Sequence, residues 1–404
     1  MSLLMIGETV SFKEEFTMIT IKKEVNPNFA YDPKLLGPEE NLVFFDIETT
    51  GLSFGRSSLY LIGVLFSEDK KWIFAQYFAE SILDEEALID SFFELINKKR
   101  RLPGNLILIH YNGDMFDIPF LKGSIKNYRL SYDFTDIISL DLYRKVKPLK
   151  SILGLSDCKL KSVEKFLGLY REDGYSGGEL IYVYEDYLKK KQKGDEAAEL
   201  LDMLLLHNEE DILDMPRVLS VLSYNDMFSS ELKLSSHETV DLSELGFNAG
   251  GSVLDLNYQL PARLPVPLDF STGPFNIAMS DENLNITAKM REGELKYFFN
   301  NYKDYYYLIY EDYAVHKSVG EFVDKGAKKK ATAKTCYMKK TGLFFPQPKE
   351  IFTPGFYEEY KGKDIYAIYD DNIFSDISRA SNYAHAVLEL ILKASKAAKK
   401  ADIS

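Results

Sequence analysis

Two carboxylates lie inside the most apolar strand-like segment of the chain. Asp46 and Glu48 follow the apolar run 42–45 in the sequence NLVFFDIETTGL. Side chains two residues apart on a β-strand point to the same face, and adjacent carboxylates in a buried sheet are unfavourable unless a positive group binds them. The pair therefore indicates a cation site. The alternative interpretation is that the strand ends near Phe45 and that solvent covers both acids.

A third carboxylate, Asp117, follows a second apolar run in the sequence NLILIHYNGDMFDIPFL. Pro119 fits a helix only in its first turn, so we expect a helix to begin here. Asp114 would then cap the helix, and Asp117 would be an acid at the third helical position, where the helix dipole favours it. This structural interpretation is compatible with metal binding, because a carboxylate at the carboxyl end of a strand can also reach a cation.

A histidine and an aspartate share the apolar face of a predicted helix. His207 and Asp211 lie in ELLDMLLLHNEEDILDMPRVLSVL, and Asn208, Glu209 and Glu210 are expected to point elsewhere. Spacings of three and four residues place side chains on one helical face; they connect Leu200, Leu204, His207, Asp211, Met215, Val218 and Leu222. An internal His–Asp pair is the structural alternative to a functional site.

These acids, brought to one point, would form an oxygen-ligand site for two divalent cations. Mg²⁺ or Mn²⁺ fits better than zinc, because the ligands are carboxylates with one histidine and no clustered cysteines. Two such ions about 4 Å apart stabilise the attacking and leaving oxygens of a phosphoryl displacement. His207 would act as general base for the attacking water. The candidate metal ligands are Asp46, Glu48, Asp117 and Asp211.

The elements that would position these residues alternate between strands and helices up to about residue 222. We expect strands at 17–22, 41–52, 105–111 and 137–142, a hairpin within 58–80, helices at 84–99 and 115–128, and several helices within 160–222. This pattern predicts an α/β domain over residues 38–224, with a mixed sheet flanked by helices, after an N-terminal extension at 1–37.

The pattern changes after residue 225. Residues 225–270 are rich in Ser, Asn, Leu and Pro, and the three prolines of LPARLPVPLDF exclude a regular element there, so this segment is interpreted as a linker. Residues 271–404 contain aromatic, strand-like runs and end in a helix at about 375–398. They are expected to form a C-terminal α+β domain rich in strands.

Composition restricts the class of protein. The chain has 404 residues, of which 46% are hydrophobic and 27% charged, as in ordinary globular proteins. No apolar run reaches the roughly 18 residues that span a bilayer, and two cysteines make no disulfide framework. With 49 basic and 62 acidic residues, the net charge of −13 disfavours coating of duplex DNA by charge alone. We expect a soluble, cytoplasmic protein.

The chain resembles the DEDD (DnaQ-like) 3′–5′ exonucleases of the ribonuclease H-like fold. The resemblance rests on three motifs that occur in the same order as in that family: FDIETTGL, NGDMFD and HNEED. A closer resemblance, to the bacterial YprB-type ribonuclease H-like proteins, rests on Asp141 in SLDLYRKVKPL, on residues 158–188 and on HNEEDILDM. The resemblance covers about residues 38–222.

The resemblance implies a role for each acid. Asp46 would bridge both metals, Glu48 and Asp211 would complete the site that holds the nucleophilic water, and Asp117 would support the second metal near the leaving oxygen. His207 stands four residues before Asp211, the spacing usual for the tyrosine-containing branch, whereas the histidine branch usually has five. The neighbouring acids interpreted as structural are Asp114, Asp141, Glu209, Glu210 and Asp214.

The C-terminal half has one feature suited to nucleic acid. The segment 326–340, GAKKKATAKTCYMKK, has six lysines and no acid, and it follows a group of tyrosines: Tyr302, Tyr305, Tyr306, Tyr307 and Tyr310. Lysines beside aromatic rings suit a single strand, because the charges follow its backbone and the rings stack on its bases. The alternative is a solvated lysine loop beside an ordinary tyrosine-rich sheet.

The sequence therefore predicts a metal-dependent nuclease that trims single-stranded DNA or RNA from the 3′ end. Two alternatives remain open. One is a structure-selective endonuclease with the same metal site, and the other is a non-catalytic nucleic-acid- or protein-binding module on this fold.

Overall fold

The computed structural model describes residues 6–12, 18–241 and 251–401, with side chains in 18–241 and 251–393. The chain forms two compact units, Met1–Leu222 and Ser223–Ser404. Each unit has hydrophobic clusters of its own.

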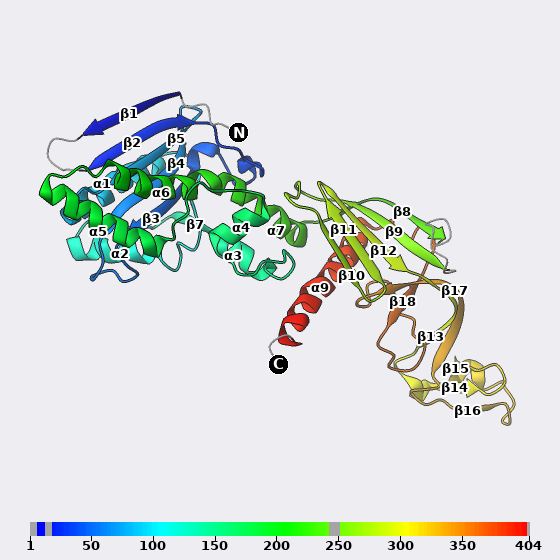
Figure 1. Ribbon diagram of the computed structural model, residues 1–404. Helices are drawn as coiled ribbons and strands as arrows, with labels where there is room; N and C mark the ends of the chain where they lie inside the picture. The colour runs from blue at the N-terminus through cyan, green and yellow to red at the C-terminus, as the bar shows by residue number, and fades with distance from the viewer. Residues whose placement is uncertain (1–5, 13–17, 242–250, 402–404) are drawn as a thin grey trace. The chain divides into compact units, whose positions relative to one another are not determined.

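A seven-stranded sheet forms the centre of the first unit, in the order β1-β2-β5-β4-β3-β6-β7 (Figure 1). Its strands are β1 (Ile6–Phe12), β2 (Ile19–Val25), β3 (Leu42–Thr49), β4 (Leu59–Glu68), β5 (Lys71–Phe78), β6 (Leu106–His110) and β7 (Ile137–Asp141). β6 runs parallel to β3 and β7, and the other neighbours are antiparallel. The mixed sheet and the β4–β5 hairpin are confirmed, whereas β1 is an additional strand that the weak pattern before residue 17 does not predict.

Helices cover both faces of this sheet. The helices of this unit up to residue 218 are α1 (Glu85–Arg100), α2 (Asp117–Tyr128), α3 (Leu142–Val146), α4 (Leu160–Phe166), α5 (Gly177–Lys193) and α6 (Ala198–Val218). Consecutive strand residues point to opposite faces. The ring of Phe45 lies 5.5 Å from that of Phe92 on α1, whereas Asp46 contacts Asn208 on α6. Helices α1 and α6 therefore lie on opposite faces, and the α6 face carries the acids of β3.

Helix α6 packs on β3, β4 and β5 through the predicted apolar stripe. Leu204, Met215 and Val218 are fully buried, and His207 is buried between them. This burial explains the long helix, since an amphipathic face packed on a sheet stabilises it far more than intrinsic propensity does. The helix is followed by a short 3₁₀ turn (Leu219–Val221) and by α7 (Leu222–Ser229).

The second unit is rich in strands, as expected. Its largest sheet is antiparallel, in the order β10-β11-β12-β9-β8, with strands β8 (Lys233–Asp241), β9 (Ser252–Gln259), β10 (Leu268–Thr272), β11 (Phe275–Ser280) and β12 (Asn283–Lys289). Helix α9 (Ile377–Ala401) packs against it, and Tyr258 on β9 donates a hydrogen bond to the carbonyl of Ala380 on α9 at 3.0 Å.

Two three-stranded sheets complete this unit. One has the order β13-β17-β18, with strands Arg291–Phe298, Tyr337–Gln347 and Ile365–Ile368. The other has the order β15-β14-β16, with strands Tyr313–His316, Tyr305–Leu308 and Lys328–Lys330, and is accompanied by the short helix α8 (Lys317–Gly320).

The interpretation of residues 225–270 as a linker is wrong. Strands β8 and β9 lie within this range and form one side of the five-stranded sheet. The alternation of buried and accessible positions in SVLDLNYQ is the strand pattern that the proline-rich composition nearby obscures. The three prolines lie in the irregular segment between β9 and β10.

None of the helices in the described part of the chain combines the length and the apolarity needed to cross a bilayer.

Candidate metal centre

The last residues of β3 place two carboxylates on the face that α6 covers. β3 continues to Thr49, and Asp46 and Glu48 pair with Gly63 and Leu61 of β4. Glu48 is 9% exposed. The alternative in which the strand ends at Phe45 and solvent covers both acids is therefore wrong.

Asn208 fixes the carboxylate of Asp46. Its Nδ2 donates to Oδ2 of Asp46 at 3.1 Å, while its Oδ1 accepts from Nε2 of Gln76 at 3.1 Å. Gln76 also donates to the carbonyl of Leu205 at 2.8 Å. Because Asp46, Gly63 and Gln76 are paired in register across three strands, the amide of Asn208 lies over one row of the sheet with its amino group toward the acid.

The expectation that Asn208 points away from the site is wrong. Asn208 is fully buried against Asp46. It lies four residues after Leu204 and three before Asp211, so helical spacing places it on the buried face too. The glycine at position 63, within an apolar run, is a second indication in the sequence that a side chain packs closely on this strand. A Cβ there would lie 2.1 Å from Oδ1 of Asn208.

Asp117 joins the same group from the start of α2. It is buried, and its Oδ1 accepts a hydrogen bond from the backbone N–H of Ile47 at 3.2 Å, between the two acids of β3. Asp117 is the first residue of the helix, not the third as expected. Asp114 does not cap the helix either, because its carboxylate contacts Ser139 Oγ at 2.5 Å and Arg144 Nε at 3.0 Å.

His207 and Asp211 complete the group from α6. Nε2 of His207 lies 3.5 Å from Oε1 of Glu48 and 3.7 Å from Oδ2 of Asp211. Glu48, His207 and Asp211 each offer one ligand atom, and these atoms all lie within 4.8 Å of one another. The structure thus brings together all five residues that the sequence identified.

The carboxylates repel one another. Burial, followed by the charges of Asp211, Asp117 and Glu48, raises the pKa of Asp46 well above its ordinary value. Burial and the charges of Asp211 and Asp117 likewise raise the pKa of Glu48, and burial raises the pKa of Asp117 to about 7. Converging oxygen ligands with excess negative charge are the environment that a hard divalent cation stabilises. The donor set therefore fits Mg²⁺ or Mn²⁺.

Two residues near this group were missed by the sequence analysis. Arg171, which is 6% exposed, forms an ion pair with Asp211 and binds Glu164 through two nitrogens, Nε lying 2.6 Å from Oε2. Asp173 contacts His207, with its Oδ2 2.6 Å from Nδ1. Both lie between α4 and α5, where no periodicity predicts which side chain turns inward.

The acids interpreted as structural have contacts of that kind. Asp141 accepts from the backbone N–H groups of Asn112 and Tyr143, both at 2.9 Å. Glu209 forms an ion pair with Lys23 at 2.5 Å. Asp214, on the same helix, is partly buried, and burial raises its pKa to about 6.

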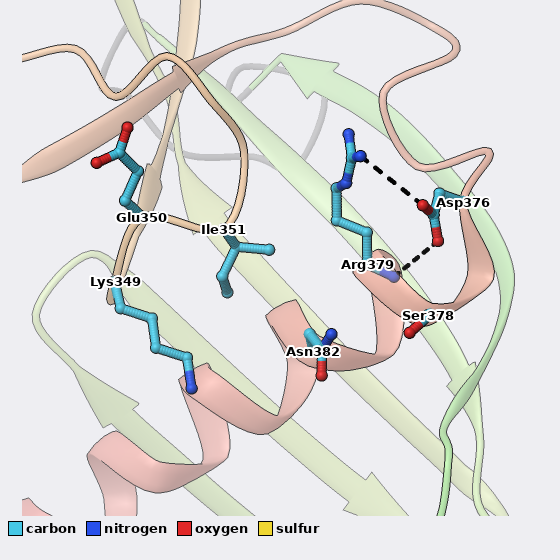
Figure 2. Close-up of a pocket in the computed structure, with 7 residues that line it drawn as sticks. All are labelled: Lys349, Glu350, Ile351, Asp376, Ser378, Arg379 and Asn382. Carbon is cyan, nitrogen blue, oxygen red and sulfur yellow. Dashed lines mark hydrogen bonds and ion pairs between the residues drawn. The ribbon is translucent and has the colours of Figure 1, made fainter.

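The second unit has a surface depression of about 460 Å³ beside the start of α9 (Figure 2). It is lined by Lys349, Glu350, Ile351, Asp376, Ser378, Arg379 and Asn382. Asp376 accepts from the backbone N–H of Arg379 at 3.0 Å and lies 3.8 Å from its guanidinium, and Lys349 lies 3.9 Å from Glu389. Both cations thus face acids, and the depression lacks a cluster of carboxylates.

Comparison with known proteins gives one family match. Residues 43–223 match the sequence profile of the RNase_H superfamily. No curated protein matches the chain.

Solved structures of E. coli exonuclease I also align with the chain. A complex with a dA16 oligonucleotide aligns at 14% identity and a TM-score of 0.26, over 55% of this chain and 55% of that chain. A zinc-bound complex with single-stranded DNA aligns at 12% identity and a TM-score of 0.26, over 87% and 70%. The profile match and the mixed sheet with helices on both faces identify the fold of residues 43–223 as ribonuclease H-like.

Proposed function

We propose that the first unit is a metal-dependent nuclease of the DEDD type that hydrolyses phosphodiester bonds of single-stranded nucleic acid. One observation carries the proposal: four carboxylates from β3, α2 and α6 converge around one histidine on a ribonuclease H-like sheet. Placing these acids together without a cation is unfavourable, so the arrangement is better explained by function than by packing.

Asp46, Glu48, Asp117 and Asp211 would hold two divalent cations, Mg²⁺ or Mn²⁺. Bound there, the cations would supply Lewis-acid stabilisation of the charge that develops on the attacking and leaving oxygens. The protein would keep the ligands in place. The hydrogen bonds from Asn208 to Asp46 and from Ile47 to Asp117 fix two of the four carboxylates before any ion binds.

His207 would accept the proton of the attacking water. Its Nε2 faces Glu48 and Asp211. Nδ1, on the other side of the ring, contacts Asp173. The water oxygen bonds to phosphorus, its proton passes to Nε2, and the bond from phosphorus to the 3′ oxygen breaks. Release from the 3′ end is part of this proposal through the resemblance of the three motifs; a structure-selective endonuclease would use the same acids.

The second unit would hold the strand. Tyr305 and Tyr307 pack in a small core beside Ala314 and Cys336, as the structural interpretation of the tyrosines expects. Tyr310 and Phe322, in contrast, are 79% and 90% exposed.

The segments that carry these two rings contact the lysine segment. The backbone N–H of Ile309 bonds to the carbonyl of Ala327, and Nζ of Lys328 bonds to the carbonyls of Gly320 and Glu321. These contacts bring the neighbours of Tyr310 and Phe322 next to the lysine segment. Of its six lysines, Lys339 alone forms an ion pair within the described residues. Exposed rings next to lysines that form no ion pair fit a single strand.

The test uses single strands of DNA and RNA labelled at either end, with Mg²⁺, Mn²⁺ or EDTA. The proposal expects metal-dependent release of mononucleotides from the 3′ end, and the Asp46→Asn protein serves as control. Internal cuts would keep the metal site and assign the reaction to an endonuclease. Metal-independent binding without any cleavage would favour the non-catalytic binding module and contradict the proposal.

A further inference from the structure

A short segment between α4 and α5, Arg171–Asp173, contacts three residues on one turn of α6. Arg171 pairs with Asp211, and Asp173 contacts His207. Glu210 accepts the backbone N–H groups of residues 172 and 173 at 2.7 and 3.1 Å. The turn that carries the third motif is therefore bound to this segment by three separate interactions.

We propose that Asp173 is a positioning residue, which fixes the orientation and the tautomer of His207. The inference rests on the site in the proposed function, but its main evidence does not depend on catalysis. Oδ2 of Asp173 lies 2.6 Å from Nδ1 of His207 and the pair is buried. An ionised carboxylate only accepts hydrogen bonds, so the neutral imidazole must carry its proton on Nδ1.

The opposite nitrogen is then free to accept a proton. With Nδ1 protonated, Nε2 has its lone pair directed toward the side where Glu48 and Asp211 lie, at 3.5 and 3.7 Å. A ring with the other tautomer would present an N–H at this position and could not act as a base. Which nitrogen carries the proton is decided by the partner of the other nitrogen.

Asp173 is itself fixed in place. Its Oδ1 accepts the backbone N–H of Tyr175 at 2.9 Å, and its Oδ2 accepts from Nζ of Lys161 at 3.0 Å. Glu210 binds the backbone of the segment to the helix that carries His207. The carboxylate therefore has little freedom to follow the ring, and the ring adopts the orientation that the carboxylate specifies.

The decisive measurement is the tautomer of His207 in the metal-free protein, read from ¹⁵N–¹H correlation spectra of ¹⁵N-histidine-labelled protein. The chain has five histidines, and His207→Gln would assign the signal. We expect a proton on Nδ1 in the wild-type protein, a mixture of tautomers in Asp173→Ala, and retention of the Nδ1 proton in Asp173→Asn, whose carbonyl oxygen still accepts. A wild-type ring with its proton on Nε2 would overturn the inference without any variant.

Steady-state kinetics provide a second test of the role of Asp173. Removing a residue that orients a functional group typically costs about 10–100-fold, so Asp173→Ala should lower kcat by that factor with KM little changed, and Asp173→Asn should recover part of it. Glu172→Ala is the matched control, because only the backbone of this residue contacts Glu210. A folded Asp173→Ala protein with unaltered tautomer and kcat would refute the role of Asp173. Absence of cleavage in the wild-type protein would refute the proposed nuclease and leave the spectroscopic result to decide this inference.

Discussion

Nδ2 of Asn208 lies 3.1 Å from Oδ2 of Asp46, and this contact depends on the absence of a side chain at position 63. Gly63 pairs with Asp46 on one side and with Gln76 on the other. The amide of Asn208 lies over this glycine and contacts both neighbours. The sheet and the helix are thus joined at the acid that the proposed mechanism places at the centre of the site.

The first prediction concerns Gly63→Ala. The new Cβ would lie 2.1 Å from Oδ1 of Asn208, so the amide must move and release Asp46. Overpacking of this kind costs about 1–3 kcal/mol, measured as the free energy of unfolding of the first unit by the fluorescence of Trp72, the one tryptophan in the chain. Gly178→Ala is the control, since a Cβ there meets no atom within 4 Å. Equal stability of the two variants would contradict this account of Gly63.

The second prediction concerns Asp46→Asn and Asp211→Asn. Both variants should fold and lose cleavage, because an amide cannot replace the charge of a carboxylate ligand. Asp46→Asn should also be at least as stable as the wild-type protein without metal, since burial and three nearby acids raise the pKa of Asp46. Cleavage rates test the first expectation. Unfolding curves followed by Trp72 fluorescence in EDTA test the second. Retained turnover in either protein, with contaminating nuclease excluded, would disprove the assignment of these ligands.

The third prediction concerns pH. Burial raises the pKa of Asp117 to about 7, whereas an unfolded aspartate titrates near about 3.9. The folded protein therefore holds a proton that the unfolded chain releases, and the associated stability is present below about pH 4 and is lost as the pH rises through about 7. In EDTA, the midpoint of thermal unfolding should fall between pH 5 and pH 8.

Asp117→Asn provides the control for this pH dependence. The variant should show a smaller fall in its unfolding midpoint over the same range, because residue 117 no longer titrates. Mg²⁺ should restore stability to the wild-type protein above pH 7, since a ligand bound only by the native state stabilises it by mass action. An identical pH dependence in the two proteins would show that Asp117 titrates normally.

The fourth prediction concerns Arg171→Ala. Hydrogen bonds to Glu164 and the charge of Asp211 hold the pKa of Arg171 above its ordinary value, although burial, the largest single effect, lowers it. Removing this guanidinium leaves the buried carboxylate of Glu164 and the partly buried one of Asp211 without their partner, and breaking a buried ion pair typically costs about 3–5 kcal/mol. Denaturant unfolding measures the loss. Lys189→Ala, which breaks an exposed ion pair with Asp186, should change little; an equally small loss in Arg171→Ala would count against a buried ion-pair network.

The fifth prediction concerns the second unit. Tyr310→Ala and Phe322→Ala should each weaken binding of a labelled single strand by roughly tenfold, because stacking of a base on a ring contributes about 1–3 kcal/mol. Fluorescence anisotropy in EDTA measures binding without cleavage. Tyr182→Ala removes another well-exposed ring, from the first unit, and is the control. Affinities that match the control in both variants would remove these rings from the proposed binding surface.

The site residues that could be predicted from the sequence are those whose burial follows the period of a strand or of a helix. Asp46 and Glu48 share one face of β3 because strand side chains alternate, and His207 and Asp211 share one face of α6 because they are a helical turn apart. Their convergence follows from the position of α6 across β3. The resemblance in the three motifs gave the same five residues.

Residues that act from irregular backbone could not be predicted in this way. Arg171 and Asp173 lie between helices, and their inward direction is set by long-range contacts with α6. The strands β8 and β9 were missed for a related reason: the local composition, rich in proline and polar residues, favours a loop, and pairing with distant strands overrides it.

The glycine at position 63 also fixes how far α6 can slide along the sheet. A displacement of the helix would carry the amide of Asn208 away from Gly63, and its hydrogen bonds with Gln76 and Asp46 would both be lost. The hydrogen bonds of Asn208 thus fix the position of α6 along its axis relative to the sheet. The separation between Asp211 and the two acids of β3 is therefore set by a contact that lies one helical turn before Asp211.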